Sequence, residues 1–144
     1  MKIRYQKLHP AAMEPLRMSP DAAGYDLFAC LEEPLGLKPG KRIAVPTGIA
    51  TAIPSGYEAQ IRPRSGIALK LGLGVLNSPG TIDADYRGEI KVILINLGEE
   101  EIIIQPRMRI AQMIITQVQS PQFELCESLD STLRADGGFG SSGH

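Results

Sequence analysis

The sequence predicts an all-β fold, a sandwich or barrel of many short strands with a single short helix. First, its 15 glycines and 11 prolines are spread at short intervals and divide the chain into brief segments. Second, between these breaks apolar residues mostly recur with a period of two, which is typical of strands with one buried face. Third, many short strands at regular spacing favour a sandwich or barrel over a layered α/β fold.

Residues 42–53 give the clearest strand pattern. β-branched residues occupy the odd positions: Ile43, Val45, Thr47, Ile49, Thr51 and Ile53. We therefore expect a strand with one buried face, bent at Pro46 and Gly48. Residues 57–62 alternate in the same way and predict a second strand.

Residues 65–71 are the one stretch with a helical pattern, barely two turns long. Residues 80–88 lie between apolar strands, and we expect a hairpin there with its turn near Asp85–Gly88. Residues 90–97 and 110–118 carry apolar residues on both faces. Strands of that kind lie in a sandwich interior or against another subunit, and in so short a chain an oligomer is the simpler explanation.

The end of the chain differs from the rest. Residues 134–144 read RADGGFGSSGH, with four glycines and a single large apolar residue, Phe139. Such a segment cannot build a core. We therefore predict a β domain over residues 1–126 and a flexible arm over residues 127–144.

The totals restrict the class of protein. With 144 residues, 43% of them hydrophobic and 22% charged, the chain predicts one soluble domain. Its net charge of −1 argues against direct nucleic-acid binding. We expect no secretory signal and no membrane span, and therefore a cytoplasmic protein in which Cys30 and Cys126 are reduced. With only His9 and His144, a Cys/His zinc site is excluded, so any metal has oxygen ligands, which favours Mg²⁺.

Residues 63–66, Pro-Arg-Ser-Gly, stand where a predicted strand ends and the short helix begins. The first N–H groups of a helix are unpaired and attract phosphate, and the Arg64 guanidinium adds a fork that fits phosphate oxygens. Ser65 either caps the helix or donates to a ligand. A cap alone is the commoner role of such a serine.

Three further places hold polar groups suited to chemistry. Asp83 follows Ile82 before the predicted turn, where a charge is costly without a partner or a task, and a carboxylate there would accept a proton from water. Asp85 fits a structural turn position. Asp26, between Tyr25 and Leu27, answers a nearby arginine on the simplest interpretation. Glycines and Arg134 in the arm suit phosphate, and Phe139 suits stacking on a base.

Together, these segments resemble the trimeric deoxyuridine triphosphatases (dUTPases). The resemblance covers nearly the whole chain through five motifs in order: AGYDL (23–27), PRSG (63–66), GTIDADYRG (80–88), RIAQMI (109–114) and RADGGFGSSG (134–143). It implies a jelly-roll, β-clip-like barrel in a homotrimer, with active sites built from several subunits. The implied reaction is hydrolysis of dUTP to dUMP and pyrophosphate with Mg²⁺, which keeps uracil out of DNA and supplies dUMP for thymidylate synthesis.

The resemblance also implies a role for each site residue. Asp83 is the general base that activates water for attack at the α-phosphorus, and Asp26 holds Mg²⁺ through water. The implied phosphate contacts are Arg64, Ser65, Gly66 and Gln112. Uracil is read by Asn77 and by main-chain groups that include Thr81, Ile82 and Lys91, and Tyr86 packs on the deoxyribose. From the arm, the implied contacts are Arg134, Phe139, Gly140, Ser141 and Ser142.

The chain departs from the family pattern at two positions of the arm. Ala135 stands where glycine is common, which narrows the backbone's conformational options, and Ser142 stands where threonine is frequent. Two alternatives share this scaffold. A dCTP deaminase of the same fold would carry a different hairpin and lack the Gly-Gly-Phe-Gly arm, and a catalytically silent nucleotide-binding module would have lost Asp83. A purely structural jelly roll leaves the charged motifs unexplained.

Overall fold

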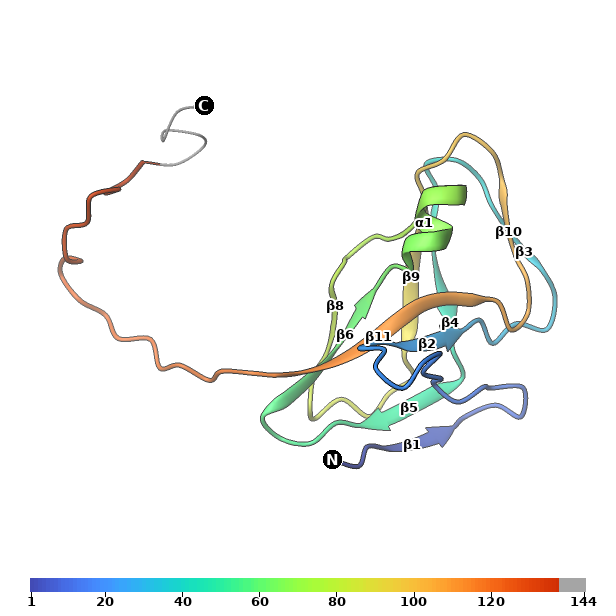
Figure 1. Ribbon diagram of the computed structural model, residues 1–144, viewed down its shortest axis with the longest axis horizontal. Coiled ribbons are helices and arrows are strands. Elements are labelled where there is room, and N and C mark those ends of the chain that lie inside the picture. The colour runs from blue at the N-terminus through green and yellow to red at the C-terminus, as the bar shows by residue number, and fades with distance from the viewer. Residues whose placement is uncertain (138–144) are drawn as a thin grey trace.

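A computed structural model of the chain describes residues 1–137. Its elements are, in order, β1 (Arg4–Lys7), β2 (Tyr25–Phe28), β3 (Leu35–Leu37), β4 (Arg42–Pro46), β5 (Ile49–Ala52), β6 (Tyr57–Arg62), α1 (Ser65–Leu71), β7 (Leu73–Val75), β8 (Gly80–Ile82), β9 (Lys91–Asn96), β10 (Ile102–Ile104) and β11 (Arg109–Gln117). The predictions of an all-β fold and of one short helix at 65–71 are confirmed (Figure 1).

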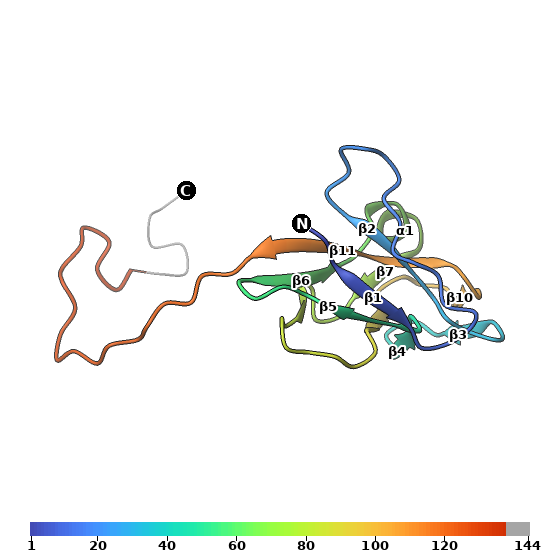
Figure 2. The same ribbon diagram turned by 90° about the horizontal axis from the view of Figure 1, so that it is seen from below.

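The strands pair in four antiparallel sheets. Four strands form the largest sheet in the order β2-β11-β6-β8, and three form a second in the order β4-β9-β7. Two further pairs, β1-β5 and β10-β3, lie beside them (Figures 1 and 2). Among the described residues, hydrogen bonding therefore divides the β structure into separate sheets and closes no continuous barrel.

One apolar core joins these sheets. Seven strands contribute large, fully buried apolar side chains, namely β2, β4, β5, β7, β9, β10 and β11: Leu27, Val45, Ile49, Leu73, Val92, Leu94, Ile104 and Ile110. They belong to a single cluster of buried residues, so the sheets pack on one another and not on separate cores. Burial of each of these side chains stabilises the fold by roughly 1.5–3 kcal/mol.

The predicted strand over 42–53 is two strands, and the break lies where the bend was expected. Thr47 and Gly48 separate β4 from β5 because their polar groups bond to another segment. The Thr47 hydroxyl donates to the Ile90 carbonyl at 2.6 Å, and the Gly48 N–H donates to the Glu89 carboxylate at 2.9 Å. These bonds fix the chain at residues 89–90 against the bend.

Helix α1 ends at Leu71 because Gly72 follows it in the left-handed region, with φ of 70°. A Cβ atom on Gly72 would lie 2.5 Å from the Gly98 nitrogen, so only glycine allows the helix end to contact the 97–98 loop. At its other end Arg64 is the N-cap residue and makes no side-chain cap bond. Ser65 is thus the first helical residue and does not cap the helix with its side chain.

The hairpin predicted over residues 80–88 is wrong. Strand β8 pairs with β6, and β9 pairs with β4 and β7, so the segment between them crosses from one sheet to the other. Strands do lie on both sides of the turn, as the apolar pattern predicts, but they pair with other strands and not with each other. The crossing leaves a space between the two sheets, and the candidate site described below lies there.

In each of the two strands predicted to be apolar on both faces, one face is buried more completely than the other. Along β9, Val92, Leu94 and Asn96 are buried, while Ile93 and Ile95 keep partial exposure. In β11 the first half is largely buried and the second half is partly exposed. One face of each strand thus packs in the core, and the other is only partly covered by this chain.

Asn96 is the most thoroughly bonded polar side chain of the core. It is fully buried, its amide donates to the Leu37 and Glu100 carbonyls at 2.8 Å each, and its oxygen accepts the Gly98 N–H at 2.8 Å. We expect Asn96→Ala to lower the free energy of unfolding by about 2–4 kcal/mol, because three backbone groups lose their partner. Urea unfolding measures this change, with the exposed Gln105→Ala as control; equal stability of the two variants would contradict it.

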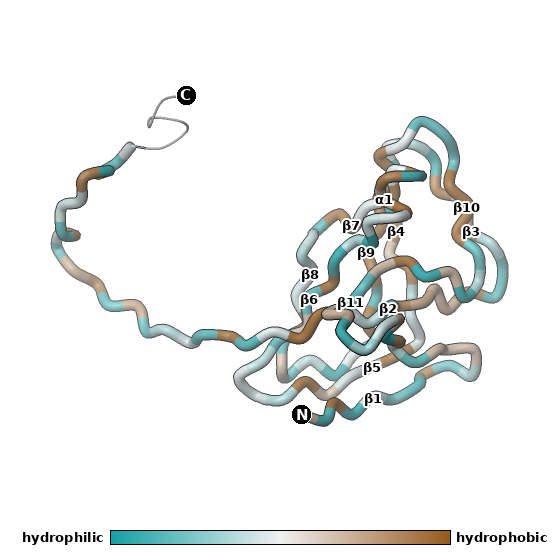
Figure 3. The backbone as a smooth tube through the Cα atoms, in the orientation of Figure 1, coloured by the Kyte–Doolittle hydropathy of each residue, from teal (hydrophilic) through white to brown (hydrophobic). Residues whose placement is uncertain are grey.

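After β11 the chain leaves the body of the molecule (Figures 1 and 3). Side chains from residue 119 to residue 136 are exposed, and Phe123, Leu125 and Leu133 make almost no contact with the domain. This course agrees with a domain that ends near residue 126, and the boundary itself stays a prediction.

Both cysteines are free, as predicted. Burial raises the pKa of the Cys30 thiol, and the Glu89 and Glu32 carboxylates add to the effect, so this thiol stays protonated. None of the helices in the described part of the chain has the length and apolar character needed to cross a membrane.

Candidate active site

The predicted site residues outside the arm fall in two clefts of the same chain. We call the first the β8 cleft; its volume is about 340 Å³. It is lined by Ala44, Ile61, Val75, Asn77, Gly80, Thr81, Ile82, Asp83, Tyr86, Glu89, Lys91, Val92 and Ile93. All six residues predicted to read the base and sugar or to act as base are in this set.

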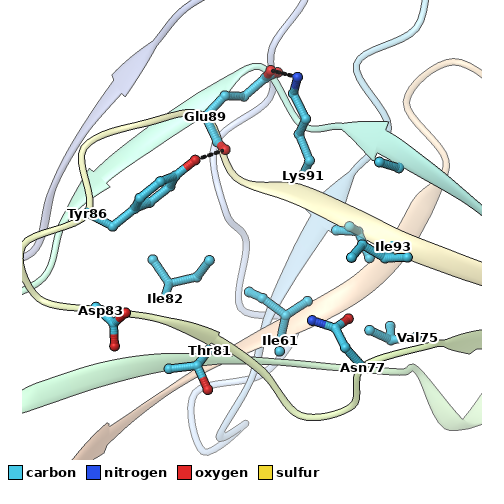
Figure 4. A pocket seen from close by; sticks show the side chains of 13 residues that line it. Ile61, Val75, Asn77, Thr81, Ile82, Asp83, Tyr86, Glu89, Lys91 and Ile93 are labelled. Atoms are coloured by element: carbon cyan, nitrogen blue, oxygen red, sulfur yellow. Dashed lines mark hydrogen bonds and ion pairs between the residues drawn. The ribbon is translucent and has the colours of Figure 1, made fainter.

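The β8 cleft lies between the four-stranded and the three-stranded sheet (Figure 4). Ile61, Ile82 and Ile93 form an apolar interior, and Asn77 lies at one end of it. Polar groups are few and stand around this interior, an arrangement typical of pockets that orient a small organic ligand.

The Asp83 carboxylate stands at the rim of the β8 cleft. Side chains alternate along a strand, so Thr81 and Asp83 leave β8 on the side opposite to Ile82 (Figure 4). Asp83 is exposed, and within residues 1–137 its carboxylate has no hydrogen bond or ion pair. Of the two alternatives stated for this charge, a partner or a task, residues 1–137 supply no partner, and water solvates the carboxylate in the single chain. Asp85 lies in the turn, outside the cleft.

Tyr86 and Lys91 are both held by Glu89. The Tyr86 hydroxyl donates to the Glu89 carbonyl at 2.9 Å, and the Lys91 ammonium lies 3.6 Å from the Glu89 carboxylate (Figure 4). The same carboxylate accepts the Gly48 N–H, so Glu89 connects the cleft wall to the bend between β4 and β5. Sequence reasoning missed Glu89, whose contacts depend on a segment 41 residues away.

The second cleft, which we call the β2 cleft, has a volume of about 370 Å³. It is lined by Met18, Ala22, Ala23, Gly24, Asp26, Arg64, Ser65, Gly66, Arg109 and Gln112. The five residues predicted to contact phosphates or magnesium from the first, second and fourth motifs are all in this set.

Asp26 is the centre of the β2 cleft. Its two oxygens accept from Arg64 Nε at 3.0 Å and from Arg109 Nη1 at 3.1 Å, and its side chain is only 10% exposed. The interpretation that Asp26 answers an arginine is therefore correct. The resemblance gives it a further role, and the two roles are compatible because a carboxylate oxygen has lone pairs for more than one donor.

Arg109 is the second residue that sequence reasoning missed. Arg109 begins the fourth motif. Because β11 pairs with β2, the Arg109 side chain reaches Asp26. Arg64 also donates to the Arg109 carbonyl at 3.2 Å. The usable signal was the charge of Asp26 between apolar neighbours, which requires a cation close by.

The β2 cleft has an excess of positive charge. Two guanidinium groups, Arg64 and Arg109, face the single Asp26 carboxylate. Gln112 donates to the Pro63 carbonyl at 2.9 Å and thereby fixes the strand end that carries Arg64. The balance and the donor types favour an anionic ligand with several oxygens, such as a phosphate chain.

The two clefts are built on different elements of the fold. Residues of β2, β11 and the start of α1 line the β2 cleft, and residues of β8, β9 and their neighbouring strands line the β8 cleft. No residue lines both clefts. Within one chain the structure gathers the predicted residues into two groups and keeps those groups apart.

The arm is described as far as Gly137. Arg134 donates to the Gly137 carbonyl at 2.8 Å and contacts neither cleft, and Ala135 has a φ of 46°. Glycine adopts this left-handed backbone conformation easily, and glycine is the residue common at this position of the family pattern. The other predicted arm contacts, Phe139, Gly140, Ser141 and Ser142, lie outside the described residues.

The part of the chain that the structure describes offers no complete set of metal ligands. No three His, Cys, Asp or Glu side chains come together there. Both oxygens of Asp26 accept from arginine, which leaves them suited to a hydrated ion and not to direct coordination. This donor set fits Mg²⁺ that is carried by a phosphate ligand and contacted through water.

The comparisons with known proteins agree. The model of the dUTPase family matches residues 11–143. The deoxyuridine 5'-triphosphate nucleotidohydrolase of Syntrophotalea carbinolica is 54% identical over 98% of this chain and 96% of its own length. The protein of that name from Chlamydia pneumoniae is 58% identical over 90% of each. A solved structure of a mutant Staphylococcus bacteriophage 80alpha dUTPase with dUpNHpp has a TM-score of 0.85 and 27% identity, with 99% of both chains covered.

Proposed function

The chain belongs to the dUTPase family, and from that premise we propose that it hydrolyses dUTP to dUMP and pyrophosphate. The observation that carries the proposal is that the residues implied by the family resemblance divide between two clefts, and that the chemistry of each cleft matches one part of dUTP. An apolar cleft with few polar groups suits a nucleoside, and a positive cleft suits a triphosphate.

A homotrimer completes the site in this proposal. Since the two clefts of one chain share no lining residue, the nucleoside and the triphosphate of one dUTP would lie in clefts of neighbouring subunits. The β8 cleft of one subunit facing the β2 cleft of the next would join them, and three-fold symmetry would repeat the site three times. The partly exposed faces of β9 and β11 are candidate subunit contacts.

The β8 cleft would bind the deoxyuridine part. Asn77 and main-chain groups of Thr81, Ile82 and Lys91 would read the uracil edge. Cytosine presents donors and acceptors in the opposite order, so its binding would leave polar groups unpaired at about 1–3 kcal/mol each. The Tyr86 ring would pack on the deoxyribose and leave no space for a 2′-hydroxyl.

Asp83 would act as the general base. Its exposed carboxylate at the cleft rim is available to accept a proton from a water molecule. That water would then attack the α-phosphorus in line with the leaving pyrophosphate. The β2 cleft would hold the phosphate chain through Arg64, Ser65, Gly66 and Gln112, so that positioning and charge stabilisation lower the barrier.

Asp26 would hold Mg²⁺ through water, and the arm would close the site. When bound to the triphosphate, Mg²⁺ supplies positive charge that stabilises the phosphate oxygens. Arg134, Gly140, Ser141 and Ser142 would contact the terminal phosphates and Phe139 the base. Closure of such a segment excludes water other than the attacking molecule.

We expect removal of Mg²⁺ with EDTA to abolish dUTP turnover but leave the melting temperature of the free protein unchanged. The reason is that the ion would arrive with the substrate, because residues 1–137 bring together no three His, Cys, Asp or Glu side chains that could hold one. Activity assays and differential scanning calorimetry measure the two effects. A fall of several degrees on chelation would contradict this role and point to a resident ion.

Pyrophosphate release from dUTP, dCTP, dTTP and UTP tests the function directly. The proposal predicts turnover of dUTP alone. Ammonia release from dCTP without pyrophosphate from dUTP would establish a deaminase instead. Tight dUTP binding without turnover in the presence of magnesium would establish a silent nucleotide-binding module.

A further inference from the structure

The Tyr86 ring lies against the main chain of residue 88. A Cβ atom built on Gly88 would lie 2.6 Å from the Cζ atom of Tyr86 and still closer to its hydroxyl oxygen. Contacts below 3.0 Å are essentially never made by real Cβ atoms. Gly88 is therefore needed for this ring position, because of the close approach and not because of its φ angle.

The carbonyl that receives the Tyr86 hydroxyl is firmly fixed. It belongs to Glu89, whose side chain accepts the Gly48 N–H at 2.9 Å. The next residue, Ile90, is fully buried, donates to the Ile49 carbonyl at 2.9 Å and accepts from Thr47. The anchor of Tyr86 is thus bonded to the bend between β4 and β5.

The Tyr86 ring is held in place by few contacts. Tyr86 is 43% exposed and does not belong to the buried core cluster. Two features fix it: the hydrogen bond to Glu89 and the absence of a side chain at residue 88. A methyl group at residue 88 would displace the ring and leave the sheets intact.

We propose that Gly88 is a positioning residue that sets the discrimination between deoxyribonucleotides and ribonucleotides. It acts through Tyr86: without a side chain at 88 the ring stays at the cleft wall, where it occupies the space that a 2′-hydroxyl requires. The inference rests on the proposed function of the β8 cleft. Preorganisation of this kind removes the ring's freedom before the substrate arrives.

The test compares kcat/KM for dUTP and for UTP in the unmutated trimer and in Gly88→Ala. We expect the ratio of the two values to fall at least about tenfold, since steric rejection of a single hydroxyl is worth up to about 100-fold. The KM for dUTP should rise while kcat changes little, because Asp83 is untouched. Tyr86→Phe, which removes the hydrogen bond without adding a clash, should move the ratio in the same direction by a smaller factor.

Gly74→Ala is the matched control. Its added methyl would lie 3.4 Å from Ile95, an ordinary contact, and Gly74 lines neither cleft. The control should keep the unmutated ratio. An unchanged ratio in folded Gly88→Ala, or an equal loss for both substrates, would overturn the proposal. If Gly88→Ala does not fold, an unchanged ratio in Tyr86→Phe overturns it. Absence of dUTP turnover in the unmutated chain would instead refute the proposed function.

Discussion

Replacing Asp83 by asparagine is expected to lower dUTP turnover by about 10²–10⁴-fold, the usual cost of losing a general base. Asparagine has nearly the same shape but no basicity, so the water would keep its place and lose its proton acceptor. Binding of dUTP should change little, because the residues proposed to contact the phosphates line the other cleft. Steady-state kinetics and titration calorimetry with dUTP measure the two quantities.

Asp85→Asn is the control for this experiment. It makes the same chemical change two residues further on, at an exposed turn position outside the β8 cleft. Its turnover should match that of the unmutated protein. Near-normal turnover in Asp83→Asn would show that another group takes the proton and that the role assigned to Asp83 is wrong.

Deletion of residues 134–144 is expected to reduce turnover by at least about 100-fold, because in the proposed mechanism the arm closes the site and completes the catalytic arrangement. The oligomer and its melting temperature should be unaffected. Side chains before the deletion point already make almost no contact with the domain; Leu129 and Leu133, for example, are 85% and 111% exposed. Gel filtration, calorimetry and kinetics test the three expectations.

A shorter deletion serves as the comparison for the arm. Removing only Gly143 and His144 leaves every predicted arm contact in place, so turnover should persist. Normal hydrolysis by the longer deletion would refute the role of the arm. Loss of the oligomer in that deletion would show instead that the arm supports assembly.

The sequence predicted those parts of the fold that depend on local pattern. The helix at 65–71 and the strand at 57–62 have the predicted bounds, because period and chain breaks act over a few residues. The hairpin predicted at 80–88 was wrong because the pairing partner of each strand is decided by packing between distant segments. There β8 pairs with residues 59–61 and β9 with residues 42–46.

In the candidate site, too, the sequence predicted what depends on local motifs and missed what depends on distant contacts. The predicted site residues outside the arm collect in the two clefts, while their roles stay predictions. Arg109 and Glu89 were missed because each acts through a contact far along the chain: Arg109 reaches Asp26 across 83 residues. The exposure of Asp83 was also missed, since its surroundings in this proposal come partly from a second subunit.

Complementation between two inactive variants tests the shared site most directly. Asp83→Asn damages only the β8 cleft, and Arg64→Ala damages only the β2 cleft. If each active site joins clefts from neighbouring subunits, unfolding and refolding an equal mixture should restore dUTP turnover at roughly a quarter of the sites, because random assembly places two intact clefts together that often. A mixture no more active than either variant alone, with mixed oligomers demonstrated, would contradict the account.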